Sequence, residues 1–257
     1  MKLIALDMDG TLLDPQGNLP AEFSDLAQRA ADKGVALAPA SGRQLPTLRT
    51  MFPDHDTFIA ENGTVVMHAG RVVSTTPIAP DVVREALAAA RGIAKQHMVV
   101  LCTPDVAYVE HGVPADAAEE LRKYYHSTEY VDSLDGIANV IKIAIYCSAG
   151  TEEYVAPALE AVADRANVAV SGAAWLDVMA AGANKGTALL QMAEALGIDQ
   201  SETCAFGDYL NDLEMLEAAG LAIAMENAHP RLKEIADRIA PPNTDNGAIT
   251  VLAELLA

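Results

Sequence analysis

The chain has 257 residues, of which 51% are hydrophobic and 21% charged, a balance typical of a globular protein with one large domain or with a domain that carries an inserted second one. We expect no membrane span and no secretion signal, and the formal net charge of −19 argues against binding to a nucleic acid backbone. The three cysteines stand in apolar stretches and predict no disulfide framework, so we expect a cytoplasmic protein. We also expect a monomer or a small homo-oligomer with no membrane or nucleic acid partner.

The N-terminal segment combines a buried strand with two carboxylates. Residues 3–6 are apolar, as in a parallel strand buried on both faces, and they are followed by Asp7, Asp9, Gly10 and Thr11. Open α/β sheets bind ligands at the carboxyl ends of their strands, where these aspartates would lie. A polar turn without chemistry is the alternative, and the rest of the chain must decide between them.

The next segments follow the order strand, polar turn, helix. We expect a helix over 20–33, a strand over 35–40 that ends in Ser41-Gly42-Arg43, a helix over 45–51, a strand over 57–60 and a hairpin over 65–73. This order is typical of βαβ units in a parallel sheet. Pro77 and Pro80 mark the end of the first part of a core domain, which we place at 1–80.

The pattern changes between residues 81 and 182. We expect helices over 81–94, 114–125 and 152–165 and strands over 98–102, 107–110, 140–147, 168–171 and 175–179. These predict an inserted α+β domain with its helices on one side of a sheet.

The α/β order returns at residue 183 and continues to 257. We expect a helix over 187–196, a strand over 203–206, a polar turn over 207–212 and a helix to 219. A strand over 221–225, a helix over 230–238 and a closing helix after 247 follow. The core is therefore predicted to be split in the sequence, as 1–80 and 183–257.

Parallel strands would bring four polar clusters to one edge of the sheet, and their charges indicate a metal ion. Two carboxylates 4 Å apart repel by about 4 kcal/mol at an effective dielectric constant near 20. Gathering Asp7, Asp9, Asp208 and Asp212 therefore requires cations, of which Lys185 supplies one. An all-oxygen ligand set favours Mg²⁺, and a phosphate is the usual partner of Mg²⁺.

The polar clusters resemble the four motifs of the haloacid dehalogenase (HAD) superfamily, specifically its Cof-type (type IIB, C2-capped) sugar-phosphate phosphatases. The matching segments are 7–11, 41–43, 185–186 and 207–212, and further Cof-like pieces stand at 61–63, 224–228 and 243–247. The resemblance implies an α/β fold, with a HAD-like (Rossmannoid) parallel sheet core and an inserted α+β C2-type cap domain at 81–182.

The resemblance also implies a Mg²⁺-dependent phosphatase that hydrolyses small phosphomonoesters, sugar phosphates above all, through an aspartyl-phosphate. Asp7 would be the nucleophile and Asp9 the general acid and base. Mg²⁺ would be held by the Asp7 carboxylate, the Asp9 main-chain carbonyl and Asp208. Phosphate-binding positions would be Gly10, Ser41, Gly42, Lys185 and Asn211, and supporting positions Thr11, Arg43 and Asp212.

Three other interpretations stay open from the sequence. A phosphomutase of the same superfamily would return the phosphoryl group to the substrate. A signalling receiver module also uses aspartates, Mg²⁺ and a lysine, but it is far shorter. The third is a non-catalytic protein that binds a phosphorylated metabolite, but the chain has a suitable residue at every catalytic position, which such a protein would not need. In the inserted segment Glu110, His111, Trp175 and Asp177 are candidate substrate contacts, although packing or solvation explains each more simply.

Overall fold

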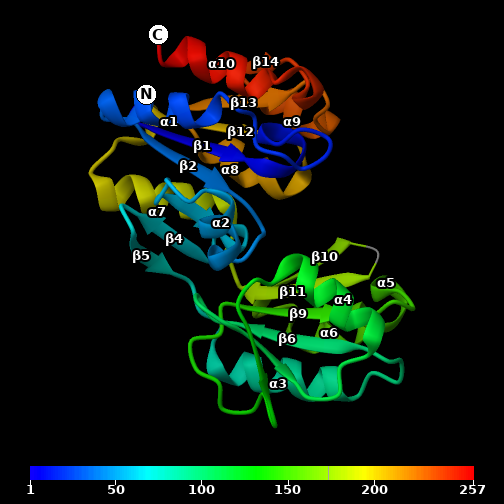
Figure 1. Ribbon diagram of the computed structural model, residues 1–257. Helices are drawn as coiled ribbons and strands as arrows, with labels where there is room; N and C mark the ends of the chain where they lie inside the picture. The colour runs from blue at the N-terminus through cyan, green and yellow to red at the C-terminus, as the bar shows by residue number, and fades with distance from the viewer. Residues whose placement is uncertain (173) are drawn as a thin grey trace. The chain divides into compact units, whose positions relative to one another are not determined.

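The structure, a computed structural model, describes residues 1–172 and 174–257 and forms two compact units (Figure 1). Unit 1 comprises Met1–Gly42, Phe52–Ser74 and Asn184–Ala257, and unit 2 comprises Arg43–Met51 and Thr75–Ala183. The α/β fold class is confirmed, since the larger sheet is mostly parallel and is connected through helices. The domain limits at 80 and 183 stay a prediction.

Unit 1 is built on an eight-stranded sheet in the order β14-β13-β12-β1-β2-β3-β4-β5. Its strands are β1 (Leu3–Asp7), β2 (Ala36–Ala40), β3 (Phe58–Ala60), β4 (Val65–His68), β5 (Arg71–Thr75), β12 (Thr203–Gly207), β13 (Leu221–Met225) and β14 (Arg238–Ala240). The strands from β14 to β3 pair in parallel, and β4 runs antiparallel to β3. The N-terminal strand therefore occupies the middle of the sheet.

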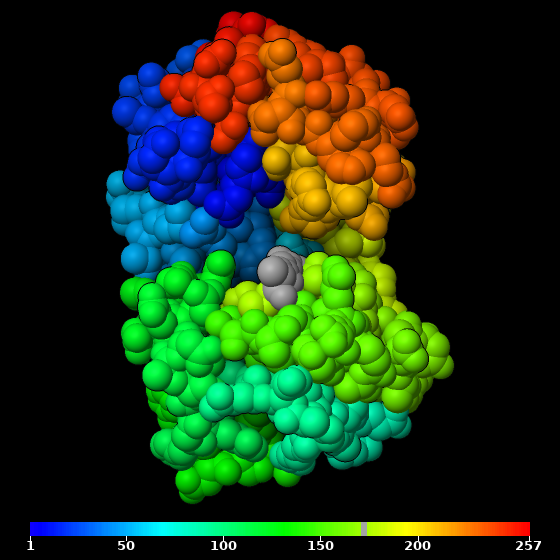
Figure 2. Space-filling view, turned by 90° about the vertical axis from the view of Figure 1, so that its right-hand side faces the viewer, coloured from blue at the N-terminus to red at the C-terminus, as the bar shows by residue number. Residues whose placement is uncertain are grey.

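The helices of unit 1 are α1 (Phe23–Asp32), α7 (Lys185–Leu196), α8 (Leu213–Ala218), α9 (Pro230–Ile235) and α10 (Gly247–Leu255). α1 packs with α10, and α7 packs with α8. Figure 2 shows the N-terminal segments in blue beside the C-terminal segments in orange and red, so residues remote in the sequence share one surface of this unit. The sheet topology explains this, because β1 pairs directly with β12.

The central strand is buried on both faces and delivers its last residue to the edge of the sheet. All five residues of β1 are buried, which fits the apolar sequence Leu-Ile-Ala-Leu before the aspartate. Leu6 is in register with Phe206 of β12, and Asp7 is in register with Ala40 of β2. The segments that follow β1, β2 and β12 thus begin at the same edge, as the sequence predicts.

Unit 2 is built on a six-stranded sheet in the order β10-β11-β9-β6-β7-β8. Its strands are β6 (Met98–Cys102), β7 (Ala107–Glu110), β8 (Thr128–Val131), β9 (Lys142–Tyr146), β10 (Ala166–Gly172) and β11 (Trp175–Ala180). Its helices are α2 (Leu45–Met51), α3 (Pro80–Arg91), α4 (Ala115–Tyr124), α5 (Thr151–Tyr154) and α6 (Ala156–Leu159). The side chains of α3 and α6 share one apolar core with alternate residues of β9 and β11.

Three predictions were wrong and one strand was missed in unit 2 and near the end of the chain. The helix expected over 152–165 is broken, since α5 ends at Tyr154 and Pro157 cannot donate a helical hydrogen bond. The polar strand β8 was missed because it has no apolar alternation. Helix α9 ends at Ile235, and Arg238, the last residue of the expected helix, begins β14. Helices do not all lie on one side, because Tyr124 of α4 contacts Trp175 on the sheet face opposite the α3 core.

Candidate active site

A buried lysine joins two aspartates at the centre of unit 1. Lys185 Nζ lies 2.5 Å from Asp7 Oδ1 and 2.7 Å from Asp212 Oδ1. The side chains of Lys185 and Asp212 are fully buried, and that of Asp7 is 7% exposed. A buried ammonium group is costly unless it is paired, and here the two aspartates pair it.

Lys185 owes its position to the start of α7. Asn184 caps this helix by accepting a hydrogen bond from Thr187 N at 2.8 Å, and Thr187 Oγ1 accepts one from Asn184 N at 3.2 Å. The reciprocal pair fixes the first turn, where Lys185 is the first helical residue. Gly63 packs on the same point, since a Cβ there would lie 2.2 Å from the Asn184 carbonyl oxygen.

Asp212 organises the turn that carries Asp208. Its Oδ2 accepts hydrogen bonds from Asp208 N at 3.0 Å and from Tyr209 N at 3.3 Å, while its Oδ1 accepts from Lys185. Gly207 is required here, because a Cβ would lie 2.5 Å from Asp212 Cβ. Both carboxylate oxygens of Asp212 are therefore occupied by protein donors.

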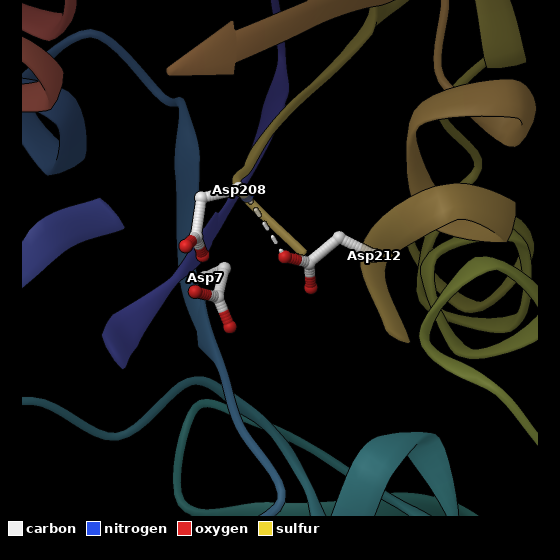
Figure 3. Close-up of side chains that lie close together, drawn as sticks. All are labelled: Asp7, Asp208 and Asp212. Atoms are coloured by element: carbon white, nitrogen blue, oxygen red, sulfur yellow. Dashed lines mark hydrogen bonds between the residues drawn. The ribbon is translucent and has the colours of Figure 1, made fainter. Parts of the chain in front are cut away.

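The side chains of Asp7, Asp208 and Asp212 lie close together (Figure 3), and Lys185 contacts two of them. One oxygen from each of Asp7, Asp208 and Asp212 lies within 4.8 Å of the others. Since Asp212 is already bonded to Lys185 and to two amides, Asp7 and Asp208 are the carboxylates best able to turn an oxygen toward a cation. One lysine balances one of these three charges, and the remaining repulsion is of the order of 3 kcal/mol at an effective dielectric constant near 20.

The charge imbalance shows in the pKa values of the site. Burial, and then the Asp212 carboxylate, raise the pKa of Asp7 well above its usual range, although Lys185 opposes them. Burial and Asp212 also raise the pKa of Asp208 to about 6. Burial by itself lowers the pKa of Lys185, but the carboxylates of Asp212 and Asp7 raise it above its usual value, so the lysine stays charged. A group of acids held this way favours an additional cation.

The turn after β1 brings Gly10 and Thr11 against Asp208. This turn, η1 (Met8–Leu12), is irregular, with φ +84° at Gly10. A Cβ at Gly10 would lie 2.2 Å from Asp208 Oδ2, and Thr11 Oγ1 donates to Asp208 Oδ1 at 3.3 Å. Glycine is thus required at this position both for its backbone conformation and for the close approach of the carboxylate.

The second predicted cluster packs against the segment 61–63. Ser41 is buried, its N–H donates to Ile59 O at 2.9 Å, and its carbonyl accepts from Asn62 N at 2.9 Å. A Cβ at Gly42 would lie 3.0 Å from the Asn62 side-chain amide nitrogen. The Cof-like piece 61–63 therefore supports both the Ser41 loop and the start of α7.

The remaining predicted positions keep their roles as predictions. Asp9 is exposed in η1, and Asn211 is exposed in the turn η5 (Leu210–Asp212). Arg43 belongs to unit 2, where its Nη1 lies 3.7 Å from Met51 Sδ. The structure brings together Asp7, Gly10, Thr11, Lys185, Asp208 and Asp212.

Two asparagines near the site had no role assigned from the sequence. Asn227 Nδ2 donates to Gly10 O at 2.8 Å, and Asn243 Nδ2 donates to Leu13 O at 3.0 Å. Both stand in the Cof-like pieces at 224–228 and 243–247, so the resemblance marked the segments without showing what they contact.

The candidate substrate contacts in unit 2 have structural partners. Glu110 Oε1 accepts from Leu134 N at 3.1 Å and lies 3.7 Å from Arg91, and His111 stacks on Tyr130 at 6.0 Å. These residues border a hollow of about 150 Å³. Trp175 packs against three tyrosine rings, those of Tyr124, Tyr125 and Tyr146, and Asp177 is buried. Packing among rings explains Trp175, whereas Glu110 and His111 are partly exposed and have polar or stacking contacts within unit 2.

Comparison with known proteins identifies the family. A profile described as haloacid dehalogenase-like hydrolase matches residues 4–252. The chain belongs to the haloacid dehalogenase-like hydrolases. Its relatives are of the Cof type, and it is a phosphatase of this superfamily, a phosphoric monoester hydrolase.

Two curated relatives and one solved structure show how far the similarity extends. The chain is 32% identical to 5-amino-6-(5-phospho-D-ribitylamino)uracil phosphatase YbjI of Escherichia coli, over 100% of this chain and 96% of that protein. It is 29% identical to HMP-PP phosphatase of Citrobacter koseri, over 90% of this chain and 86% of that protein. A crystal structure from Eubacterium rectale is 29% identical and superposes with a TM-score of 0.90, covering 99% of both chains. The family members therefore share both parts of this fold.

Among residues 1–172 and 174–257, no helix combines the length and the apolar character needed to cross a membrane.

Proposed function

We propose that this haloacid dehalogenase-like hydrolase is a Mg²⁺-dependent phosphatase of small phosphomonoesters that works through a phosphorylated Asp7. The observation that carries the proposal is the buried bridge from Lys185 to Asp7 and Asp212, with Asp208 against it. A lysine held between two carboxylates supplies fixed positive charge beside the proposed nucleophile. Phosphoryl transfer requires this kind of positioning and charge neutralisation.

The residues of the site fit a magnesium ion. Asp7 and Asp208 offer hard oxygen ligands, and burial together with the neighbouring Asp212 carboxylate raises their pKa values, while Asp212 is already bonded to the protein. Asp7, Asp208 and the Asp9 main-chain carbonyl would hold the ion. When bound, Mg²⁺ would supply a positive charge that neutralises phosphoryl oxygens.

The first half of the proposed reaction transfers the phosphoryl group to the enzyme. A carboxylate oxygen of Asp7 attacks phosphorus, and the bond from phosphorus to the ester oxygen breaks. Asp9 gives its proton to the departing oxygen, so the leaving group departs as an alcohol. Lys185 and Ser41 would bind phosphoryl oxygens, with Gly42 and Asn211 beside them.

The second half returns Asp7 to its carboxylate form. Asp9, now deprotonated, takes a proton from a water molecule, whose oxygen attacks phosphorus. The bond between phosphorus and Asp7 breaks and inorganic phosphate leaves. In a phosphomutase a substrate hydroxyl would replace this water.

We propose phosphorylated metabolites of sugar or sugar-alcohol type as the substrates, with residues 81–182 acting as a cap. The sugar-alcohol type is supported by the name of one curated relative, a phosphatase of a phosphoribitylamino compound, and the name of the other, HMP-PP phosphatase, supports a small phosphorylated substrate only. We expect a monomer or a small homo-oligomer.

Purified protein incubated with a panel of phosphate esters tests the proposal. We expect phosphate release with Mg²⁺ that stops on addition of EDTA. A metabolite-binding protein without catalysis would give no chelator-sensitive release on any ester, and a phosphomutase would give isomerised ester without free phosphate.

Two variants test the assigned chemistry. Asp7→Asn should fold and reduce activity to background, because an amide is a poor nucleophile. Asp9→Asn should slow turnover about 100-fold or more and accumulate phosphorylated protein, since it cannot activate water. Retained turnover in Asp7→Asn would contradict the assigned nucleophile.

A further inference from the structure

Two asparagines outside the four motifs hold the main chain of the turn Met8–Leu12, which carries the proposed acid and base, and of the residue that follows the turn. Asn227 Nδ2 donates to Gly10 O at 2.8 Å, directly after Asp9, and Asn243 Nδ2 donates to Leu13 O at 3.0 Å. Asn243 N donates to Asn227 Oδ1 at 3.1 Å, which joins the two contacts into one chain of hydrogen bonds. We call these residues the asparagine pair.

The turn held by this pair has an irregular backbone. Asp9 has φ −76° and ψ 117°, and Gly10 has φ +84° and ψ −5°, so both residues have non-helical backbone angles inside a turn that the hydrogen bond from Leu13 N to Met8 O closes. The main chain of a glycine is the most easily rotated in a protein. A rotation at Gly10 would move Asp9, whose carbonyl carbon is bonded to Gly10 N. Fixing the Gly10 carbonyl thus restricts where Asp9 points.

The anchors of the pair are rigid. Asn227 closely follows β13, a buried strand of the central sheet, and Lys233 Nζ donates to the carbonyl of the adjacent Glu226. Asn243 lies in a closed loop, where Gly247 N donates to Pro242 O at 3.2 Å. A Cβ at Gly247 would lie 1.8 Å from the Pro241 carbonyl oxygen, so this loop is tightly packed. The pair connects the turn to well-fixed backbone.

We propose that Asn227 and Asn243 are positioning residues that orient Asp9 for proton transfer to the leaving group. This rests on the proposed function, in which Asp9 is the general acid. Asn227 is exposed, so its amide contributes little to the core. Its side chain binds the active-site turn through Nδ2 and its partner asparagine through Oδ1, so both ends of the amide serve the same chain of hydrogen bonds.

The test compares esters that differ in their need for an acid. The leaving group of p-nitrophenyl phosphate is stable as an anion and needs no acid. The leaving group of an alkyl phosphate such as glycerol phosphate is an alcohol, which departs only when its oxygen is protonated. kcat/KM covers the steps through formation of phosphorylated Asp7, so it reports the acid step. We therefore measure kcat/KM for both esters at saturating Mg²⁺.

The informative variant is Asn227→Ala, which removes the donor to Gly10 O and adds no charge beside the proposed phosphate site. We expect kcat/KM for the alkyl ester to fall about 10- to 100-fold, because the proposed acid is misplaced, and kcat/KM for the p-nitrophenyl ester to change less than about threefold. Asn243→Ala should give the same asymmetry. Equal losses on both esters, or no loss on either, would overturn the proposal.

The matched control is Asn18→Ala, in the same unit. Asn18 is also exposed and donates through Nδ2 to a carboxylate, that of Asp14, at 3.0 Å, but both residues lie outside the turn Met8–Leu12. We expect unchanged kcat/KM on both esters. If the wild-type protein hydrolyses no ester of the panel, the proposed function fails; if it hydrolyses both test esters and the variants lose equally, only the positioning role fails.

Discussion

Replacing Lys185 by methionine tests the central ion bridge. At an effective dielectric constant near 20, the contacts at 2.5 and 2.7 Å each correspond to about 6 kcal/mol of attraction. Removing an ammonium group from water offsets several kcal/mol of that gain, so the net cost of losing one partner of a buried pair is about 3 to 5 kcal/mol. This is a large part of the roughly 5 to 15 kcal/mol by which domains are typically stable.

The measurement is the free energy of unfolding from urea titration at pH 7 in EDTA. Arg238→Met is the matched control, since Arg238 lies 2.6 Å from Glu254 but both side chains are more than a third exposed. That variant should lose less than about 1 kcal/mol. At pH 5 the deficit of Lys185→Met should shrink, because Asp7 and Asp208 have raised pKa values and take up protons. A loss as small as that of the control at both pH values would refute this account of the site.

Three further outcomes follow from the geometry. Gly10→Ala should reduce kcat about 100-fold or more, because its Cβ would meet Asp208 Oδ2 at 2.2 Å, whereas Gly17→Ala, with a similar φ of +80° and open space, should leave turnover unchanged. Because burial and a neighbouring carboxylate raise the pKa of Asp208 to about 6, the metal-free folded protein binds more protons than the unfolded chain between about pH 4 and 6. Its unfolding free energy should therefore fall as pH rises through that window, and a rise there in EDTA would contradict the pKa shift. Gln44→Ala should lower the free energy of unfolding in urea by about 1 to 3 kcal/mol, since the buried Gln44 amide both donates to and accepts from the Ser127 main chain at 3.1 Å. An unchanged free energy of unfolding would show that these two hydrogen bonds do not stabilise the fold.

The parts of the fold that could be predicted from sequence were those in which local pattern and tertiary environment agree. The buried parallel strands β1 and β13 read as continuous apolar runs, and both are buried as expected. The polar strand β8 has no such run and is defined by its pairing with β7, which a single sequence does not display. The same holds for β14, whose first residue, Arg238, was expected to end a helix but which pairs with β13.

The candidate site divides in a similar way. Asp7, Lys185 and Asp208 could be predicted because their chemistry requires particular side chains, and parallel topology brings the strand ends together. The double role of Asp212 could not, since which oxygen meets Lys185 and which meets the amides of residues 208 and 209 depends on the shape of one turn.

The asparagine pair shows why positioning residues are hard to find from sequence. An amide that binds a carbonyl needs no charge partner and no repeated spacing, so nothing in the composition of 224–228 or 243–247 points to the turn at Gly10. The parallel order β14-β13-β12-β1 carries both segments to the edge where Asp7 ends. The proposed chemistry of this site thus depends on the identity of its carboxylates and lysine. The orientation of the turn Met8–Leu12 depends on hydrogen bonds to its main chain from segments remote in the sequence, such as the one from Asn227 to Gly10. It follows that variants of the pair should alter how the proposed acid is presented while leaving the nucleophile and its lysine in place.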